Sequence, residues 1–172
     1  FSRRLRKALI HTTVLLTATN ENKKIFERVH SKKSIYIPEN GTFGKFHESE
    51  FSMSKNNGKI NLVWIGSVDH RKNLQILVDA VCGVKDKFSI QINVIGSGHL
   101  LPYIKDLVKD KGLNDLFTFY GQLPRSSVAE IIKKSDLHVI TSINEGNPTT
   151  IWEVMSYGLP TMTVSHCGMA DT

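Results

Sequence analysis

From residue 59 onward, apolar strands alternate with helices of amphipathic spacing, and this alternation constrains the fold more than any other feature. The expected strands cover residues 60–65, 88–95, 116–120, 137–140 and 160–164. Between the first two, Leu74, Leu77, Val78 and Val81 recur at helical spacing. The strands are nearly continuous apolar runs, as is typical of strands buried on both faces. The pattern predicts an α/β fold, a doubly wound, Rossmann-like parallel sheet with helices on both faces.

The first 58 residues follow a different pattern. Short strands are expected at residues 13–17 and 34–37, on either side of a helix at about 21–29, and a polar stretch from Asn40 to Gly58 is the best linker candidate. We expect residues 1–58 to be the tail of a preceding domain plus a linker, and residues 59–172 to be a second domain. The chain begins with Phe1, and it stops after the strand at 160–164 with no helix to cover it. We therefore expect a piece of a longer protein whose second domain is C-terminally incomplete.

Length and cysteine content place only weak limits on how the chain is stabilised and on whether it binds a metal. A chain of 172 residues buries enough surface to fold without a disulfide or a metal ion. Cys82 and Cys167 have neither metal-ligand spacing nor the look of a disulfide framework, so two reduced thiols are expected. The histidines form no pair at helical spacing that would suit a metal. No metal site and no bound cofactor are therefore predicted.

The net charge of +6 narrows the choice of partners. Its basic excess is concentrated early, in Arg3 to Lys7 and in Lys32-Lys33, without interleaved aromatic residues, which argues against nucleic acid. The first run could lie against anionic lipid or be a solvated helix face, and both alternatives stay open. No apolar stretch approaches the ~20 residues that span a bilayer, and no signal peptide is apparent. A cytoplasmic protein is expected, with a peripheral position at the inner membrane face kept open.

Ligands of open α/β sheets bind outside the carboxyl ends of the strands. The loops expected there are residues 66–72, 96–99, 121–125 and 143–148. Three of them begin with glycine, at Gly66, Gly96 and Gly121, where the backbone must turn sharply or approach something closely. These loops are the predicted site.

The loop at 143–148 is the most informative. Asn147 suits a helix N-cap and Pro148 the first helical position, while Gly158 marks the end of that helix. The free amides at such a start can hold a phosphate, and the hydroxyls of Thr149 and Thr150 could add donors. Similarly, residues 127–130 have the form of a capping box and are expected to open the preceding helix.

Two carboxylates bracket the start of this helix. Glu145 precedes it, and Glu153 follows Thr149 by four residues, so Glu153 and Thr149 share one face. Carboxylates suit sugar diols because they accept hydrogen bonds at several lone pairs. On the residues alone, Glu145 could equally be a favourable partner of the helix dipole and Glu153 a solvated side chain.

The segment from Glu145 to Pro160 resembles the E-x7-E signature of a large family of retaining glycosyltransferases with two Rossmann-like domains, the GT-B fold of family 4. Residues 35–41 are similar to the hinge between the two domains, and Gly66 to Asn73 to the loop that opens the second domain. Residues 94–98 and 119–123 match the next two strand–loop units. The resemblance spans about residues 12–172.

The resemblance implies a donor-binding domain at residues 59–172, half of a GT-B fold, that transfers a sugar from a nucleoside diphosphate to an acceptor hydroxyl with retention. UDP-sugar is favoured over GDP-sugar, without a metal, in glycan or polysaccharide biosynthesis. The acceptor would be a glycan, a lipid-linked glycan or a small molecule. The implied donor-site residues are Glu145 (sugar), Gly146, Asn147, Pro148, Thr149 and Thr150 (sugar and diphosphate), Glu153 (ribose), Lys72 with Arg71 (phosphate), Gly121, Gln122 and Leu123 (base), and the loop from Gly66. The acceptor site is expected in the preceding domain, so this chain alone is expected to bind donor without turnover.

One departure from the family pattern, one motif that is set aside and two alternatives accompany this interpretation. Family members commonly carry arginine directly after the first glycine, where this chain has Ser67, so Arg71 would have to substitute. Gly96 and Gly98 begin like a dinucleotide fingerprint, but Leu101 stands where a third glycine belongs. His138 is expected to be packed rather than catalytic. A sugar-nucleotide epimerase of the same architecture and a non-catalytic nucleotide-sugar-binding module remain the alternatives.

Overall fold

The structure is a computed structural model that describes residues 2–30, 32–37, 58–165 and 169. These residues form two compact units. The described parts of the first are residues 2–30, 32–37, 144–148, 165 and 169, and those of the second are residues 58–143 and 149–164. The hinge-like residues 38–41, most of the predicted linker and Cys167 lie outside the described residues. The domain boundary at residue 58 stays a prediction.

The first unit carries two helices and a pair of short parallel strands. In chain order they are α1 (Arg3–Ile10), β1 (Leu16–Thr17), α2 (Asn20–His30) and β2 (Ile35–Tyr36). The basic run at Arg3 to Lys7 forms α1, whose N-cap Ser2 accepts a hydrogen bond from the Leu5 amide at 3.2 Å. Both strands are shorter than the sequence predicts.

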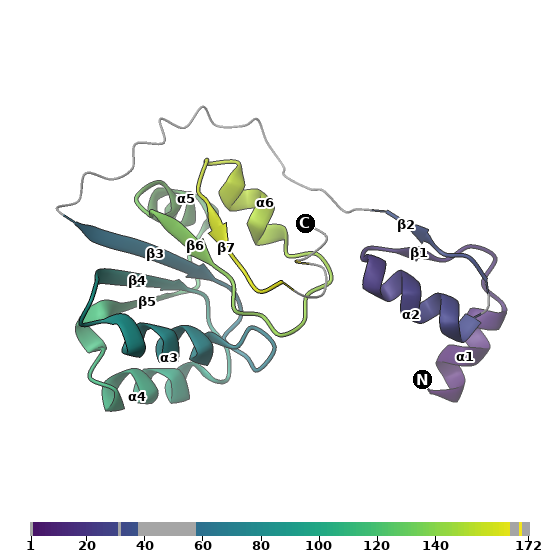
Figure 1. The fold of residues 1–172 in the computed structure, drawn as a ribbon, viewed down its shortest axis with the longest axis horizontal. Coiled ribbons are helices and arrows are strands. Elements are labelled where there is room, and N and C mark those ends of the chain that lie inside the picture. Colours follow the sequence, from purple (N-terminus) through teal and green to yellow (C-terminus); the bar gives the residue numbers. More distant parts are fainter. Residues whose placement is uncertain (1, 31, 38–57, 166–168, 170–172) are drawn as a thin grey trace. The chain divides into compact units, whose positions relative to one another are not determined.

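The second unit contains a five-stranded parallel sheet with helices on both faces, as the sequence predicts (Figure 1). The strand order is β5-β4-β3-β6-β7. In chain order the elements are β3 (Lys59–Ile65), α3 (Leu74–Val84), β4 (Ser89–Ile95), α4 (Leu101–Asp110), the 3-10 turn Asn114–Leu116, β5 (Phe117–Gly121), α5 (Arg125–Lys133), β6 (Leu137–Val139), α6 (Thr149–Met155) and β7 (Thr161–Met162). Helices α3 and α4 cover one face and α5 and α6 the other (Figure 1).

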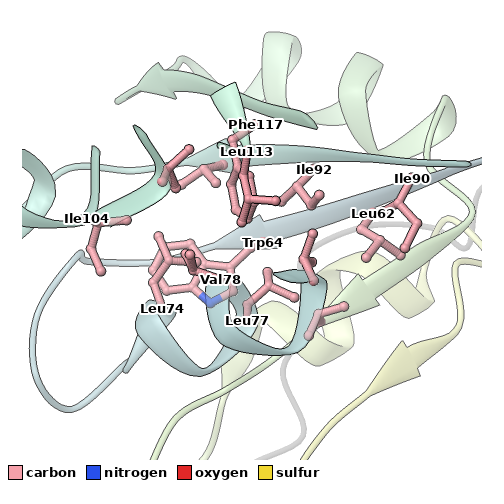
Figure 2. Packing of buried hydrophobic residues seen from close by; sticks show 14 of the residues in the cluster. Leu62, Trp64, Leu74, Leu77, Val78, Ile90, Ile92, Ile104, Leu113 and Phe117 are labelled. Carbon is pink, nitrogen blue, oxygen red and sulfur yellow. The ribbon is translucent and has the colours of Figure 1, made fainter. Parts of the chain in front are cut away.

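Successive side chains of β3 point to opposite faces of this sheet, as the two-residue repeat of a strand requires. Leu62 and Trp64 belong to the larger core, beneath α3 and α4, where Trp64 lies near Leu74 and Val78 (Figure 2). Val63 belongs to the smaller core with residues of α5 and α6. A strand buried on both sides carries apolar residues on both of its faces, which explains the nearly continuous apolar runs.

Two helix starts differ from the sequence predictions. Helix α5 begins at Arg125, after an N-cap at Pro124 that makes no side-chain hydrogen bond, so the capping box predicted at Ser127 does not form. Pro124 is extended, and the amides of Ser127 and Val128 bond its carbonyl oxygen instead. Helix α6 begins at Thr149, one residue after the predicted start. Among the described helices, none has the length and apolar character to span a membrane.

Candidate functional site

The strand order reverses direction between β3 and β6. From β3 the chain moves outward through β4 to β5, and it then returns to place β6 on the other side of β3. The loops that follow β3 and β6 meet across this switch point. The Thr141 hydroxyl donates to the Lys72 carbonyl oxygen at 2.7 Å, and the Ile143 amide donates to the Arg71 carbonyl oxygen at 2.9 Å. The switch point is where open α/β sheets bind ligands, and Lys72 and Arg71 lie beside it.

The glycine loops after β3, β4 and β5 extend the sheet's hydrogen bonding beyond the strands. The Gly66 amide donates to the Ile95 carbonyl oxygen at 3.0 Å, and the Gly96 amide donates to that of Gly121 at 2.7 Å. Gly96 and Gly121 have positive φ angles of 133° and 66°. The close backbone approach predicted at these glycines is therefore the approach of one of these loops to the next.

Lys72 lies in the loop before α3 rather than in the helix. The Asp69 carboxylate accepts a hydrogen bond from the Lys72 amide at 2.8 Å, and Asn73 adopts a left-handed conformation before α3 begins at Leu74. The aliphatic part of Lys72 lies over Gly66, since a Cβ on Gly66 would be 3.5 Å from its Cδ and Cε atoms. Lys72 is partly buried, whereas Arg71 is exposed.

The predicted residues after β6 divide between the two units. Thr149, Thr150 and Glu153 lie on α6 in the second unit, where Thr149 and Glu153 share one helix face as predicted. Glu153 is partly exposed. Asn144 to Pro148 belong to the first unit, and there the Glu145 side chain is buried, with 7% of its surface exposed. The roles implied for these residues stay predictions.

The segment Gly121 to Leu123, implied as the base site, begins at the last residue of β5. Gln122 is exposed, while Leu123 packs against the smaller hydrophobic core. The Gly121 carbonyl oxygen is occupied by the Gly96 amide. A ligand here would meet the backbone of residues 122 and 123 rather than the Leu123 side chain.

His138 is packed in the sheet, as expected. Its side chain has no exposed surface, and its Nδ1 atom lies 3.2 Å from the Thr161 hydroxyl on β7. Burial, together with the positive charge of Lys72, lowers the pKa of His138 to about 4. Its Nε2 atom is buried without a hydrogen-bond partner in the described part of the chain. The imidazole is therefore neutral at physiological pH.

The exposed loop histidines lie close to each other. The ring centroids of His70 and His99 are 5.7 Å apart, with planes inclined at 55°. His70 also lines a cavity of about 160 Å³ between the loop after β3 and helices α3 and α4, together with Asp69 and Tyr103. The Tyr103 hydroxyl donates to Gln75 Oε1 at 3.2 Å beside this cavity.

Residues 45–172 match the sequence model of the family described as Glycosyl transferases group 1. The chain belongs to this family. That match covers about three quarters of the glycosyltransferase chain, including all the strands and helices of its second unit.

Curated relatives are also glycosyltransferases. The chain is 23% identical over 110 residues to an uncharacterized glycosyltransferase of Methanocaldococcus jannaschii, covering 64% of this chain and 28% of that protein. It is 25% identical over 126 residues to the 2-deoxystreptamine glucosyltransferase of Streptomyces kanamyceticus, covering 73% of this chain and 32% of that protein. This glycosyltransferase chain thus spans about a third or less of these relatives.

Solved structures share the fold. The lipopolysaccharide outer core galactosyltransferase WaaB has a TM-score of 0.76 at 19% identity, over 92% of this chain and 47% of that one. The Anabaena protein HepE, solved in complex with UDP and glucose, has a TM-score of 0.77 at 16% identity, over 99% of this chain and 51% of that one. The described fold of the glycosyltransferase chain matches half of a GT-B enzyme.

Three residues around Lys72 are absent from the sequence predictions, namely Trp64, Asp69 and Thr141. Asp69 could have been found, because an aspartate side chain commonly caps a turn by accepting a hydrogen bond from the amide three residues later. Trp64 and Thr141 could not, since the bond between the Trp64 indole and the Thr141 hydroxyl joins residues 77 apart in the sequence.

Proposed function

We propose that this chain is the donor-binding half of a retaining glycosyltransferase of family 4. It binds a nucleoside-diphosphate sugar, with UDP-sugar favoured and GDP-sugar the alternative, and the sugar passes to a hydroxyl of a glycan, lipid-linked glycan or small-molecule acceptor. The observation that carries the proposal is the placement of Lys72 at the switch point of a glycosyltransferase-family sheet. Two similar proteins, a glucosyltransferase and a protein solved with UDP and glucose, support the choice of ligand.

Each proposed role follows from the chemistry of the side chain. Lys72, assisted by Arg71, contacts the diphosphate, since cationic donors form strong charge-assisted bonds with phosphate oxygens. Glu153 accepts hydrogen bonds from the ribose hydroxyls and Glu145 from the donor sugar. The backbone of Gly146 to Thr150 meets the sugar and diphosphate, with N–H donors at every position except Pro148, and Gly121 to Leu123 line the base.

The reaction replaces one bond at the anomeric carbon. The bond to the diphosphate oxygen breaks, and the acceptor oxygen bonds to the same face of the sugar, so the configuration is retained. The acceptor hydroxyl gives up its proton in this step, and the departing diphosphate oxygen can accept it. Negative charge develops on the departing diphosphate, and a fixed cation stabilises it best because no reorganisation is needed during the step. In this scheme Lys72 and Arg71 supply that charge, so no metal is required.

Calorimetric titration tests the proposal. This chain is titrated with UDP, GDP and ADP in the presence of EDTA, and the titration is repeated with Lys72→Ala and Glu153→Ala. We expect one nucleotide to bind, and Lys72→Ala to weaken it roughly tenfold or more, the loss of one charge-assisted contact. Glu153→Ala should weaken binding of the nucleoside diphosphate more than it weakens binding of inorganic pyrophosphate. If none of the three nucleotides binds, or if binding is insensitive to both substitutions, the proposal is wrong. The proposal also implies no sugar transfer by residues 1–172 alone.

A further inference from the structure

Lys72 is held at both of its backbone polar groups and along its side chain. Its amide donates to Asp69 Oδ1 at 2.8 Å, and its carbonyl oxygen accepts from the Thr141 hydroxyl at 2.7 Å. The aliphatic stem lies over Gly66, where no side chain can displace it. Asp69 and Gly66 belong to the same loop as Lys72, whereas Thr141 reaches it from the loop after β6. Thr141 thus ties Lys72 itself to the other side of the switch point, beside the bond from the Ile143 amide to the Arg71 carbonyl oxygen.

The direction of the hydrogen bond from Thr141 is set by its acceptor, because a carbonyl oxygen cannot donate. The Trp64 indole nitrogen lies 3.1 Å from the Thr141 hydroxyl oxygen. A carbonyl oxygen only accepts and an indole N–H only donates, so the hydroxyl gives its single proton to the Lys72 carbonyl oxygen and accepts from Trp64. Trp64 and Thr141 are 2% and 5% exposed, so water does not compete for these bonds. The hydroxyl therefore has one arrangement that satisfies both neighbours.

We propose that Thr141 is a positioning residue for the donor site, and that Trp64 orients its hydroxyl toward Lys72. This inference rests on the proposed contact between Lys72 and the diphosphate. Removing the hydroxyl leaves two buried groups, the Trp64 indole and the Lys72 carbonyl, without their partner. The Lys72 carbonyl then loses its bond to the loop after β6 while the amide keeps its bond to Asp69. Small displacements of a charged group weaken its contact with phosphate.

The test compares Thr141→Val, which keeps the shape and removes the hydroxyl, with Thr141→Ser, which keeps the hydroxyl. UDP binding is measured for both variants, for Lys72→Ala and for the double variant with Thr141→Val and Lys72→Ala. We expect Thr141→Val to weaken UDP about fivefold, the loss equivalent to one neutral hydrogen bond, and Thr141→Ser to stay within twofold of the original chain. In the Lys72→Ala background, Thr141→Val should have no further effect, because it acts through Lys72.

A second measurement needs no nucleotide. Hydrogen exchange of the Trp64 indole and of the Asn73 amide is expected to quicken in Thr141→Val and to stay unchanged in Thr141→Ser. If Thr141→Val does not fold, Thr141→Cys replaces it, because a thiol of similar size is only a weak donor.

The outcomes separate the two proposals. Unchanged UDP affinity in Thr141→Val, or an equal loss with and without Lys72, overturns the positioning role while the proposed function stands. Faster exchange in Thr141→Val together with undiminished UDP binding by Lys72→Ala overturns the phosphate contact of Lys72, and the positioning role for donor binding falls with it.

Discussion

The carbonyl oxygen of Gly66 lies where a side chain on Gly96 would begin, since a Cβ atom built on Gly96 would be 1.8 Å from that oxygen. The contact joins the loops after the two central strands β3 and β4. It holds the loop after β3, which carries Lys72, against the loop after β4, and the Gly66 amide donates to the Ile95 carbonyl oxygen at the same place.

Gly96→Ala is therefore expected to destabilise the fold. The clash is with backbone, and the φ of 133° is unsuited to any side chain, so a loss of about 3 kcal/mol or more in the free energy of unfolding is expected. Urea unfolding checks it. Gly83→Ala is the matched control, because Gly83 lies within α3 with nothing within 4 Å of its Cβ position, and this change should stabilise by roughly 0.5–1 kcal/mol. Equal effects of the two substitutions would contradict the structure.

His138 should make stability depend on pH. Its pKa is about 4 in the folded chain, below the ordinary histidine value of 6.5 that applies when the chain is unfolded. As pH falls below 6.5 the unfolded chain binds a proton that the folded chain does not, so the free energy of unfolding falls until about pH 4, by up to ~3 kcal/mol in total. The variants His138→Phe and His138→Gln should each reduce this slope between pH 7 and 5. A slope unchanged in both variants would rule out His138 as its source.

Asp136 should contribute to stability but not to donor binding. Its Oδ2 atom accepts a 2.7 Å bond from the Asn61 amide, and its own amide donates to the Asn61 carbonyl oxygen at 2.8 Å, at the end of β3 opposite the site. Asp136→Ala removes a partly buried acceptor and should cost about 1–2 kcal/mol of unfolding free energy. UDP affinity at a temperature well below unfolding should be unchanged, and Asp136→Asn should retain most of the stability.

The effect of the Lys72 charge on UDP binding should be distinguishable from an effect of the chain's net charge. If its ammonium group contacts the diphosphate, Lys72→Ala weakens UDP and also reduces the salt dependence of binding. Lys59→Ala removes one charge at the opposite end of β3, where the Lys59 ammonium group bonds Gln91 at 3.0 Å, and should do neither. Equal losses in both variants would indicate a general effect of net charge.

The sheet could be predicted from the sequence because its strands are buried on both faces. Apolar runs such as β3 leave little choice of structure, and all five strands occur where expected, although β7 is only two residues long. Helix starts were harder, as at α5, where the geometry of Pro124 prevails over the capping pattern at Ser127. No local sequence pattern predicts the strand order β5-β4-β3-β6-β7.

The contact of Lys72 with the loop after β6 could not be predicted, because it depends on the strand order. The Thr141 hydroxyl and the Lys72 carbonyl are 69 residues apart, and nothing in the neighbourhood of either residue indicates the other. The near contact of Gly66 and Gly96 likewise requires the register of β3 with β4. Local chemistry could predict which loops carry glycine and charge, but not which loops touch.

The position of β6 beside β3 has a consequence for the order of folding. The β3–β4 and β4–β5 pairs are made between strands that follow each other in the chain, whereas the bond from Asn61 to Asp136 closes a separation of 75 residues. Closing the longer loop costs more entropy, so β6 is expected to dock after the other three strands have assembled. The contact between β3 and β6 beside Lys72 is then made only after β3, β4 and β5 have paired, and a nucleotide bound there would stabilise the late-forming side of the sheet.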